Sequence, residues 1–149
     1  MYNVLLHSHS GLRWIALILI VVAILNAFRS QASGQYGKKD KMINLFAMVI
    51  LHIQLLIGFL LFYMNEKSKV SFSEGWMKVD MFRFFGMEHI IGMILAITVI
   101  TLGRSKAEKK LKGTRDKHRR VMMSYSIGLL LILLSIPWPF RASLGGAWF

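Results

Sequence analysis

Four runs without a charged side chain divide this chain, at residues 14–28, 42–65, 90–103 and 121–140. A helix that crosses a membrane needs about 20 residues, with a range of roughly 17–25. The second and fourth runs reach this length unaided, and the first and third reach it with their apolar N-terminal flanks. Because hydrophobic residues make up 55% of the chain, the pattern predicts one membrane domain over residues 1–149. Its expected spans are residues 8–28, 42–64, 81–103 and 119–137.

The connections between these runs are short, which favours antiparallel neighbours. Residues 30–41 form a polar turn rich in Gly and Ser, as expected between two hairpin helices. Pro137 and Pro139 cannot continue a regular helix and end the last span. We therefore expect an all-α polytopic membrane protein, an up-down bundle of four transmembrane helices.

The formal charge of +12 is concentrated in two loops, residues 29–41 and 104–120, whereas the loop at 66–80 carries both signs. Loops rich in Lys and Arg stay in the cytoplasm. This pattern predicts a bacterial inner-membrane protein with both basic loops inside and both termini in the periplasm. The basic residues are expected to lie near the lipid bilayer's anionic headgroups, and no nucleic-acid partner is expected.

The chain has no cysteine. Disulfides, thiolate metal sites and covalent c-type haem attachment are therefore excluded, and any haem must be held non-covalently through His or Met. The sequence also lacks a P-loop, a GxGxxG motif, an HExxH motif and a recognisable nucleophile–base pair. An electron carrier or a subunit is thus expected rather than a stand-alone enzyme.

Two histidines fall deep within the predicted spans, and ionisable groups at that depth usually face a bundle interior or a functional site. His52 lies in the second span, with Gln54 on roughly the opposite helix face. His52 is interpreted either as a ligand or proton-handling residue, or as a structural interhelical hydrogen bonder. His89 lies in the third span beside small residues such as Gly92. That small face favours either close helix packing or room for a flat porphyrin.

Two ligands of one iron must lie at similar depth. With residues 28, 42 and 103 as inner boundaries and a rise of about 1.5 Å per residue, His52 lies roughly 15 Å deep, His89 roughly 21 Å and His9 roughly 29 Å. His52 and His89 form the best predicted pair, and His9 with His89 is the alternative. His7 lies further out, whereas Arg13 is close to the level of His89.

Charged groups near these histidines are interpreted as supporting residues. Arg13 and Arg83 are candidates to hold haem propionates, although Arg13 is equally consistent with a side chain that reaches the outer headgroups. Glu88 is expected to pair with Arg83, Arg13 or a histidine nitrogen. His118, within the densest basic loop, is expected to be solvated or at headgroup level.

Five segments carry a resemblance to a known family: HSHSGLRW, LHIQLLIG, RFFGMEHIIG, TLGRSKA and IPWPF. Together they resemble small four-helix membrane proteins of Bacteroidetes-type bacteria known as cytochrome b-like, similar to cytochrome b561-type bundles. The resemblance covers essentially the whole chain. It implies one b-type haem in a respiratory setting, carried by His7, His9, His52 and His89. A quinone, a redox partner protein, other membrane subunits or a second copy are the partners that it implies.

Three functions remain open at this point. The first is a haem-b electron carrier or a haem-bearing subunit of a quinol-linked complex, with axial histidines on two helices. The second is a non-catalytic accessory subunit, in which the histidines only join helices. The third is copper or proton handling, with Met87 and Met93 around His89 and an outer entry site at His7 and His9.

Overall fold

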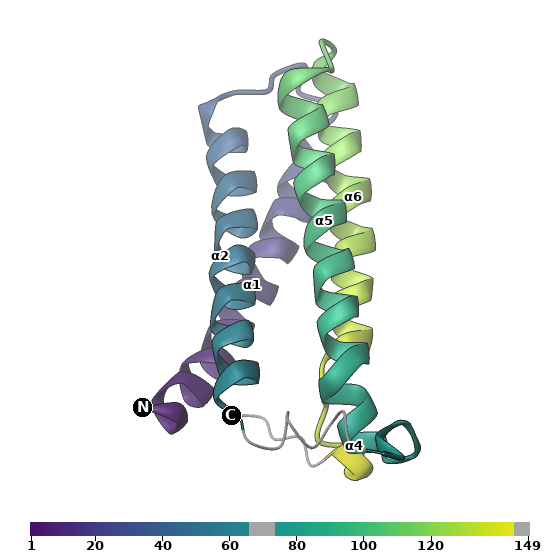
Figure 1. The fold of residues 1–149 in the computed structure, drawn as a ribbon. Helices are drawn as coiled ribbons and strands as arrows, with labels where there is room; N and C mark the ends of the chain where they lie inside the picture. The colour runs from purple at the N-terminus through teal and green to yellow at the C-terminus, as the bar shows by residue number, and fades with distance from the viewer. Residues whose placement is uncertain (66–73, 145–149) are drawn as a thin grey trace.

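The structure, a computed structural model, describes residues 1–65 and 74–144, and these residues form helices without a strand. The four long helices are α1 (Tyr2–Ser30), α2 (Lys38–Met64), α5 (His89–Lys109) and α6 (Thr114–Ser135). The short elements are η1 (Trp76–Lys78), α4 (Asp80–Arg83), the π-helical turn η2 (Phe84–Glu88) and η3 (Ala142–Leu144). Elements α4, η2 and α5 follow one another without a break (Figure 1).

The long helices alternate in direction, so the chain forms an up-down bundle (Figure 1). Helix α5 packs most extensively against α6, and α1 packs against both α2 and α6, whereas α2 and α5 share a smaller contact. This places α1 and α5 on one diagonal of the bundle and α2 and α6 on the other. The connections at residues 31–37 and 110–113 share one end, and the start of α1 shares the opposite end with η3 (Figure 1).

The four predicted spans fall on α1, α2, the continuous stretch from α4 through α5, and α6, but their bounds differ. Helix α1 begins at Tyr2, earlier than the expected start at residue 8, and α5 continues to Lys109. Of the loop predicted at 66–80, residues 66–73 lie outside the described residues. Helix α6 ends at Ser135 because Pro137 cannot continue it, and the Trp138 indole Nε1–H donates to the Leu133 carbonyl oxygen at 2.8 Å.

The interface between α5 and α6 is built from small residues that let the two backbones approach closely. A Cβ added at Gly92 would overlap the hydroxyl of Ser135, and one added at Gly103 would overlap Ser124. Ala96 and Ile100 are fully buried in the same face. The small face predicted on the third span is therefore a packing surface for α6.

The outer surface of the bundle is strongly apolar. By length and composition, three helical stretches among the described residues could cross a membrane: α1, α2 and Asp80–Lys109. Helix α6 does not meet the same criterion, since its first turns are charged and it ends at Ser135. Large hydrophobic side chains are nevertheless exposed on all four long helices, among them Ile18, Leu56, Leu102 and Leu134. Water-soluble monomers rarely expose so much contiguous apolar surface, so a bilayer is the environment that this surface fits.

Candidate functional site

Two histidines meet across one diagonal of the bundle, near the end that holds the start of α1. His9 of α1 and His89 of α5 have ring centroids 6.5 Å apart, with an angle of 71° between the ring planes. Helix α1 crosses the bundle obliquely (Figure 1). This obliquity explains how His9 reaches the level of His89, although a depth count along straight helices separates the two by roughly 8 Å.

The orientation of His89 is fixed by a backbone group of α6. Its Nδ1 lies 2.6 Å from the carbonyl oxygen of Ser135, which can accept a hydrogen bond but cannot donate one. A hydrogen bond in this geometry needs a proton on His89 Nδ1, and in the neutral ring the lone pair is then on Nε2. The close approach that Gly92 permits brings the Ser135 carbonyl within reach. The rings of Phe84 and Phe85 lie 5.8 and 6.4 Å from the His89 ring and shield it.

His9 is held from helix α2. The side-chain Nε2–H of Gln54 donates to the backbone carbonyl of His9 at 2.6 Å. A Cβ at Gly58 would stand 3.3 Å from the His9 ring, so this glycine makes room for the imidazole. The Nδ1 of His9 is buried and finds no hydrogen-bond partner within the described part of the chain. An unpartnered buried polar atom is uncommon in native proteins, which marks His9 as a candidate ligand.

A turn of π-helix, Phe84–Glu88, directly precedes His89. Such turns are rare and are frequently found at functional sites. The guanidinium of Arg83 donates to Glu88 Oε1 at 2.7 Å, to Asp80 Oδ1 at 3.0 Å and to the Met77 carbonyl at 3.2 Å. The predicted pairing of Glu88 with Arg83 is present, and it leaves Arg83 engaged by protein groups rather than directed at the histidines.

Arg13 lies one helical turn after His9 and is half-buried. Its guanidinium carbon is 5.5 Å from the centre of the Trp14 ring. Trp14 in turn contacts Trp138, with centroids 6.3 Å apart. Arg13 and the two indole rings therefore form a continuous series of contacts between α1 and the segment after α6.

The remaining predicted site residues lie elsewhere. The Nδ1 of His52 is 2.8 Å from the Met48 carbonyl of its own helix. The His52 side chain lines a small groove of about 230 Å³ together with Ile94 and Thr98 of α5. The ring contacts of His89 in the described structure are with His9, Phe84 and Phe85. The structure thus brings together the alternative pair, and His7 is exposed near the start of α1.

A second polar cluster fills the opposite end of the bundle and was not foreseen from the sequence. The Tyr36 hydroxyl donates to Glu108 Oε1 at 2.6 Å and accepts from Asn44 Nδ2 at 3.1 Å. The Tyr125 hydroxyl donates to the Asn44 carbonyl at 2.6 Å, across the α2–α6 diagonal. The side chain of Asn26 also donates to Asp40 at 2.7 Å. The cluster joins all four long helices. Polar residues within the apolar runs were the sequence feature that could have indicated it.

The expectation that His118 is solvated is wrong, because only 1% of this residue is exposed. Its Nε2 lies 2.8 Å from the carbonyl oxygen of Gln35, and its ring packs edge-on against Tyr36 with centroids 4.9 Å apart. The chain connecting α1 and α2 folds over the start of α6 and covers this imidazole. His118 therefore belongs to the second polar cluster.

The donor set at the histidine pair fits one group better than a free ion. Among the described residues, no group of three or more His, Cys, Asp or Glu side chains is placed to hold a metal ion. A haem iron takes four ligands from the porphyrin and needs only two from the protein. The pair on α1 and α5 offers this number of imidazole donors, one of them with Nδ1 against a backbone carbonyl. Comparisons with protein-family models, curated proteins and solved structures give no match for this chain.

Proposed function

We propose that this chain is a membrane-embedded b-type haem protein, with one haem held non-covalently by His9 and His89. The observation that carries the proposal is the approach of these two rings. Two imidazoles that bind one metal ion from opposite sides, each through a nitrogen at about 2.0–2.1 Å, have ring centres roughly 6 Å apart. The observed separation is 6.5 Å. The resemblance to cytochrome b-like proteins points to the same cofactor.

The neighbours of the pair support this assignment. A histidine ligand usually donates its other ring N–H to a carbonyl or carboxylate, which sets the tautomer and the ring orientation, and the Ser135 carbonyl does this for His89. Arg13 replaces Arg83 as our candidate partner for a propionate, because Arg83 already bonds Glu88 and Asp80. A bound haem supplies one-electron transfer, which suits a carrier or a subunit of a quinol-linked complex.

The same proposal includes the topology of the chain. We assign α6 as a fourth span, since its outward face exposes Ile127, Leu130 and Leu134 as the other helices expose their apolar residues. The basic loops at 29–41 and 104–120 then lie in the cytoplasm by the positive-inside rule. In a bacterial inner membrane, the histidine pair lies toward the periplasm, and a quinone or a redox protein is the expected electron partner.

The absorption spectrum of the purified protein tests this function. After expression with sufficient haem, the wild-type protein should show a Soret band, and a sharp α-band on reduction with dithionite. His9→Ala and His89→Ala should each lower the haem content at least about tenfold, because losing even an outer-shell partner costs 10–100-fold in affinity. The matched control His52→Ala should keep the spectrum. A colourless wild-type protein, or loss of the bands in the His52 variant alone, would contradict the proposal.

A structural subunit is the second candidate, and the hydrogen bonds of the site favour it. Gln54 bonds the backbone of α1, and His89 bonds the backbone of α6, so both already connect helices without a cofactor. For such a subunit, His89→Ala lowers the unfolding temperature while no variant changes the visible spectrum. Metal analysis of the same preparation separates both candidates from copper handling.

A further inference from the structure

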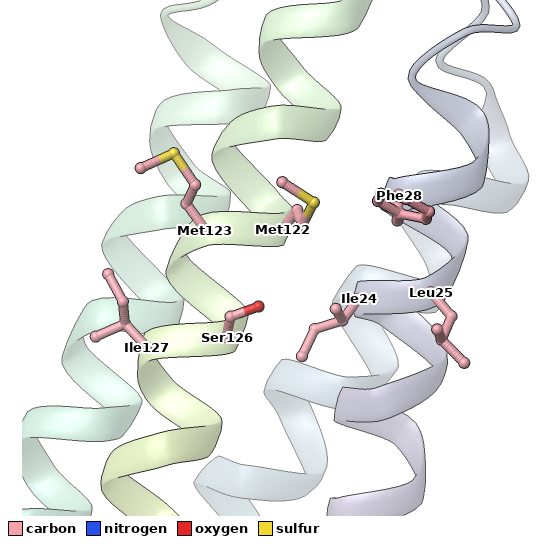
Figure 2. Close-up of a pocket in the computed structure, with 7 residues that line it drawn as sticks. All are labelled: Ile24, Leu25, Phe28, Met122, Met123, Ser126 and Ile127. Atoms are coloured by element: carbon pink, nitrogen blue, oxygen red, sulfur yellow. The ribbon is translucent and has the colours of Figure 1, made fainter.

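An apolar groove of about 420 Å³ lies between α1 and α6. Figure 2 shows Met122 and Ser126 of α6 facing Ile24 and Phe28 of α1 across this opening. Its volume is within the range of about 300–1,000 Å³ typical of ligand sites. The residues that line the groove are Ile24, Leu25, Phe28, Met122, Met123, Ser126 and Ile127.

The lining of this groove fits a hydrocarbon chain. Ser126 is its one side chain with a polar group, and the rest are aliphatic, aromatic or thioether groups. Leu25, Phe28, Met123 and Ile127 are all substantially exposed. The groove therefore opens on the apolar outer surface of the bundle, where a lipid tail has direct access.

Basic residues stand at one end of the groove only. Arg29 lies four residues after Leu25, and Arg119 lies three residues before Met122. Residues at these spacings share a helix face, so Arg29 stands one turn beyond Leu25 and Arg119 about one turn beyond Met122. Both are exposed. At the same end, the Gln31 side chain donates a hydrogen bond to Met122 Sδ at 3.3 Å and bridges the two helices.

We propose that this groove binds one anionic phospholipid, with an acyl chain along α1 and α6 and the phosphate at Arg29 and Arg119. Charge complementarity selects this occupant. Basic pockets between transmembrane helices on the cytoplasmic side bind acidic headgroups, and Arg pairs bidentately with phosphate. A second copy of the chain would instead bring its own arginines against these two. This proposal rests on the membrane placement and sidedness proposed above but not on the haem, so loss of lipid preference and loss of the haem spectrum are separate outcomes.

Lipid retention measured by native mass spectrometry tests the site. The wild-type protein in detergent micelles is offered palmitoyl-oleoyl phosphatidylglycerol or the phosphatidylcholine with the same chains. Two basic residues at a membrane surface favour the anionic lipid by about thirtyfold together. The double variant Arg29→Gln/Arg119→Gln should bind both lipids equally. The matched control Lys39→Gln/Lys112→Gln removes the same charge from exposed residues at the same end and should keep the preference.

A second variant tests the tail. Ser126→Phe fills the groove and should lower retention of both lipids, whereas Leu130→Phe, exposed on the same helix outside the lining, should not. Equal binding of the two lipids by the wild-type protein would overturn the proposal. So would an unchanged preference in the arginine variant, full retention in Ser126→Phe, or a dimer that carries no lipid.

Discussion

At the scale of single residues, Tyr36 is the side chain that joins the most elements at the basic end. Its hydroxyl bonds Glu108 of α5 and Asn44 of α2, and its ring packs on His118 of α6. Burial, and then the hydrogen bond to Glu108, raise the pKa of Tyr36 above its ordinary value of about 10. The folded state therefore holds the phenolic proton more tightly than the unfolded chain does.

This shift predicts an alkaline loss of stability that depends on Tyr36. A group whose folded pKa is raised contributes fully below its unfolded pKa, and the contribution is lost as pH rises beyond it. At neutral pH, Tyr36→Phe should lower the free energy of unfolding by about 1.5–3 kcal/mol, since it removes a hydrogen bond to a charged group. The difference from wild type should shrink above about pH 10. Unfolding in mixed micelles measures this difference, and Tyr63→Phe, at a residue that is 85% exposed, is the control. A difference between Tyr36→Phe and wild type that stays constant up to pH 12 would contradict the assignment.

Residues such as His9 and His118 show what could be read from the sequence and what could not. The sequence singled out His89, and it included His9 as an alternative partner. It ranked His52–His89 above His9–His89, because depth along straight helices ignores the obliquity of α1. His118 was misjudged because charge density predicts solvation on average, whereas a folded connection covers this particular imidazole.

At the scale of elements, the contact between α5 and α6 positions the histidine site. The glycines at 92 and 103 are eleven residues apart, as are their partners Ser124 and Ser135. Eleven residues are close to three helical turns, so both contacts lie on one face of each helix. This register places the Ser135 carbonyl beside His89, so the packing face between α5 and α6 is also part of the site.

Gly92→Ala should therefore disturb the bundle although alanine favours helix. The added methyl overlaps Ser135, and overpacking costs about 1–3 kcal/mol of stability. The double variant with Ser135→Ala should recover part of this loss, because the overlapping hydroxyl is gone. Thermal unfolding in detergent measures the effect.

The control for this substitution is Gly11→Ala in α1, where an added Cβ meets nothing within 4 Å. It should raise stability by up to about 1 kcal/mol through helix propensity alone. If both alanines raise stability, the two helices do not approach each other as closely as the structure has them.

The sequence predicted the number and alternating direction of the long helices, because each apolar run indicates one helix and its length, and the prolines indicate where the last helix ends. It did not predict the π-helical turn Phe84–Glu88. Nothing in a run of aromatic and small residues distinguishes that turn from regular α-helix, since one wider turn leaves the hydrophobic pattern almost unchanged. Its position is decided by tertiary contacts, including the Arg141 guanidinium 5.0 Å from the centre of the Phe84 ring.

At the scale of the whole molecule, the decisive question is whether α6 crosses the membrane. Its first turns are charged, its apolar portion begins only after Arg120, and the helix ends at Ser135. Its packing along α5, a helix long and apolar enough to span, gives it the same extent across the bundle. The two helices stay in contact from Gly103–Ser124 to Gly92–Ser135. The proposal that α6 is a fourth span rests on this pairing and not on the hydropathy of α6 alone.

Because the chain has no cysteine, single cysteines can report this topology without background. In intact spheroplasts, a membrane-impermeant maleimide should label Glu74→Cys and Ser143→Cys, and should leave Ser33→Cys unlabelled until the cells are lysed. All three positions are exposed, so protection reports the side of the membrane and not burial in the fold. A chain with three spans would protect Ser143→Cys together with Ser33→Cys. That outcome would put the segment after α6 in the cytoplasm, apart from Trp14, which Trp138 contacts in the structure.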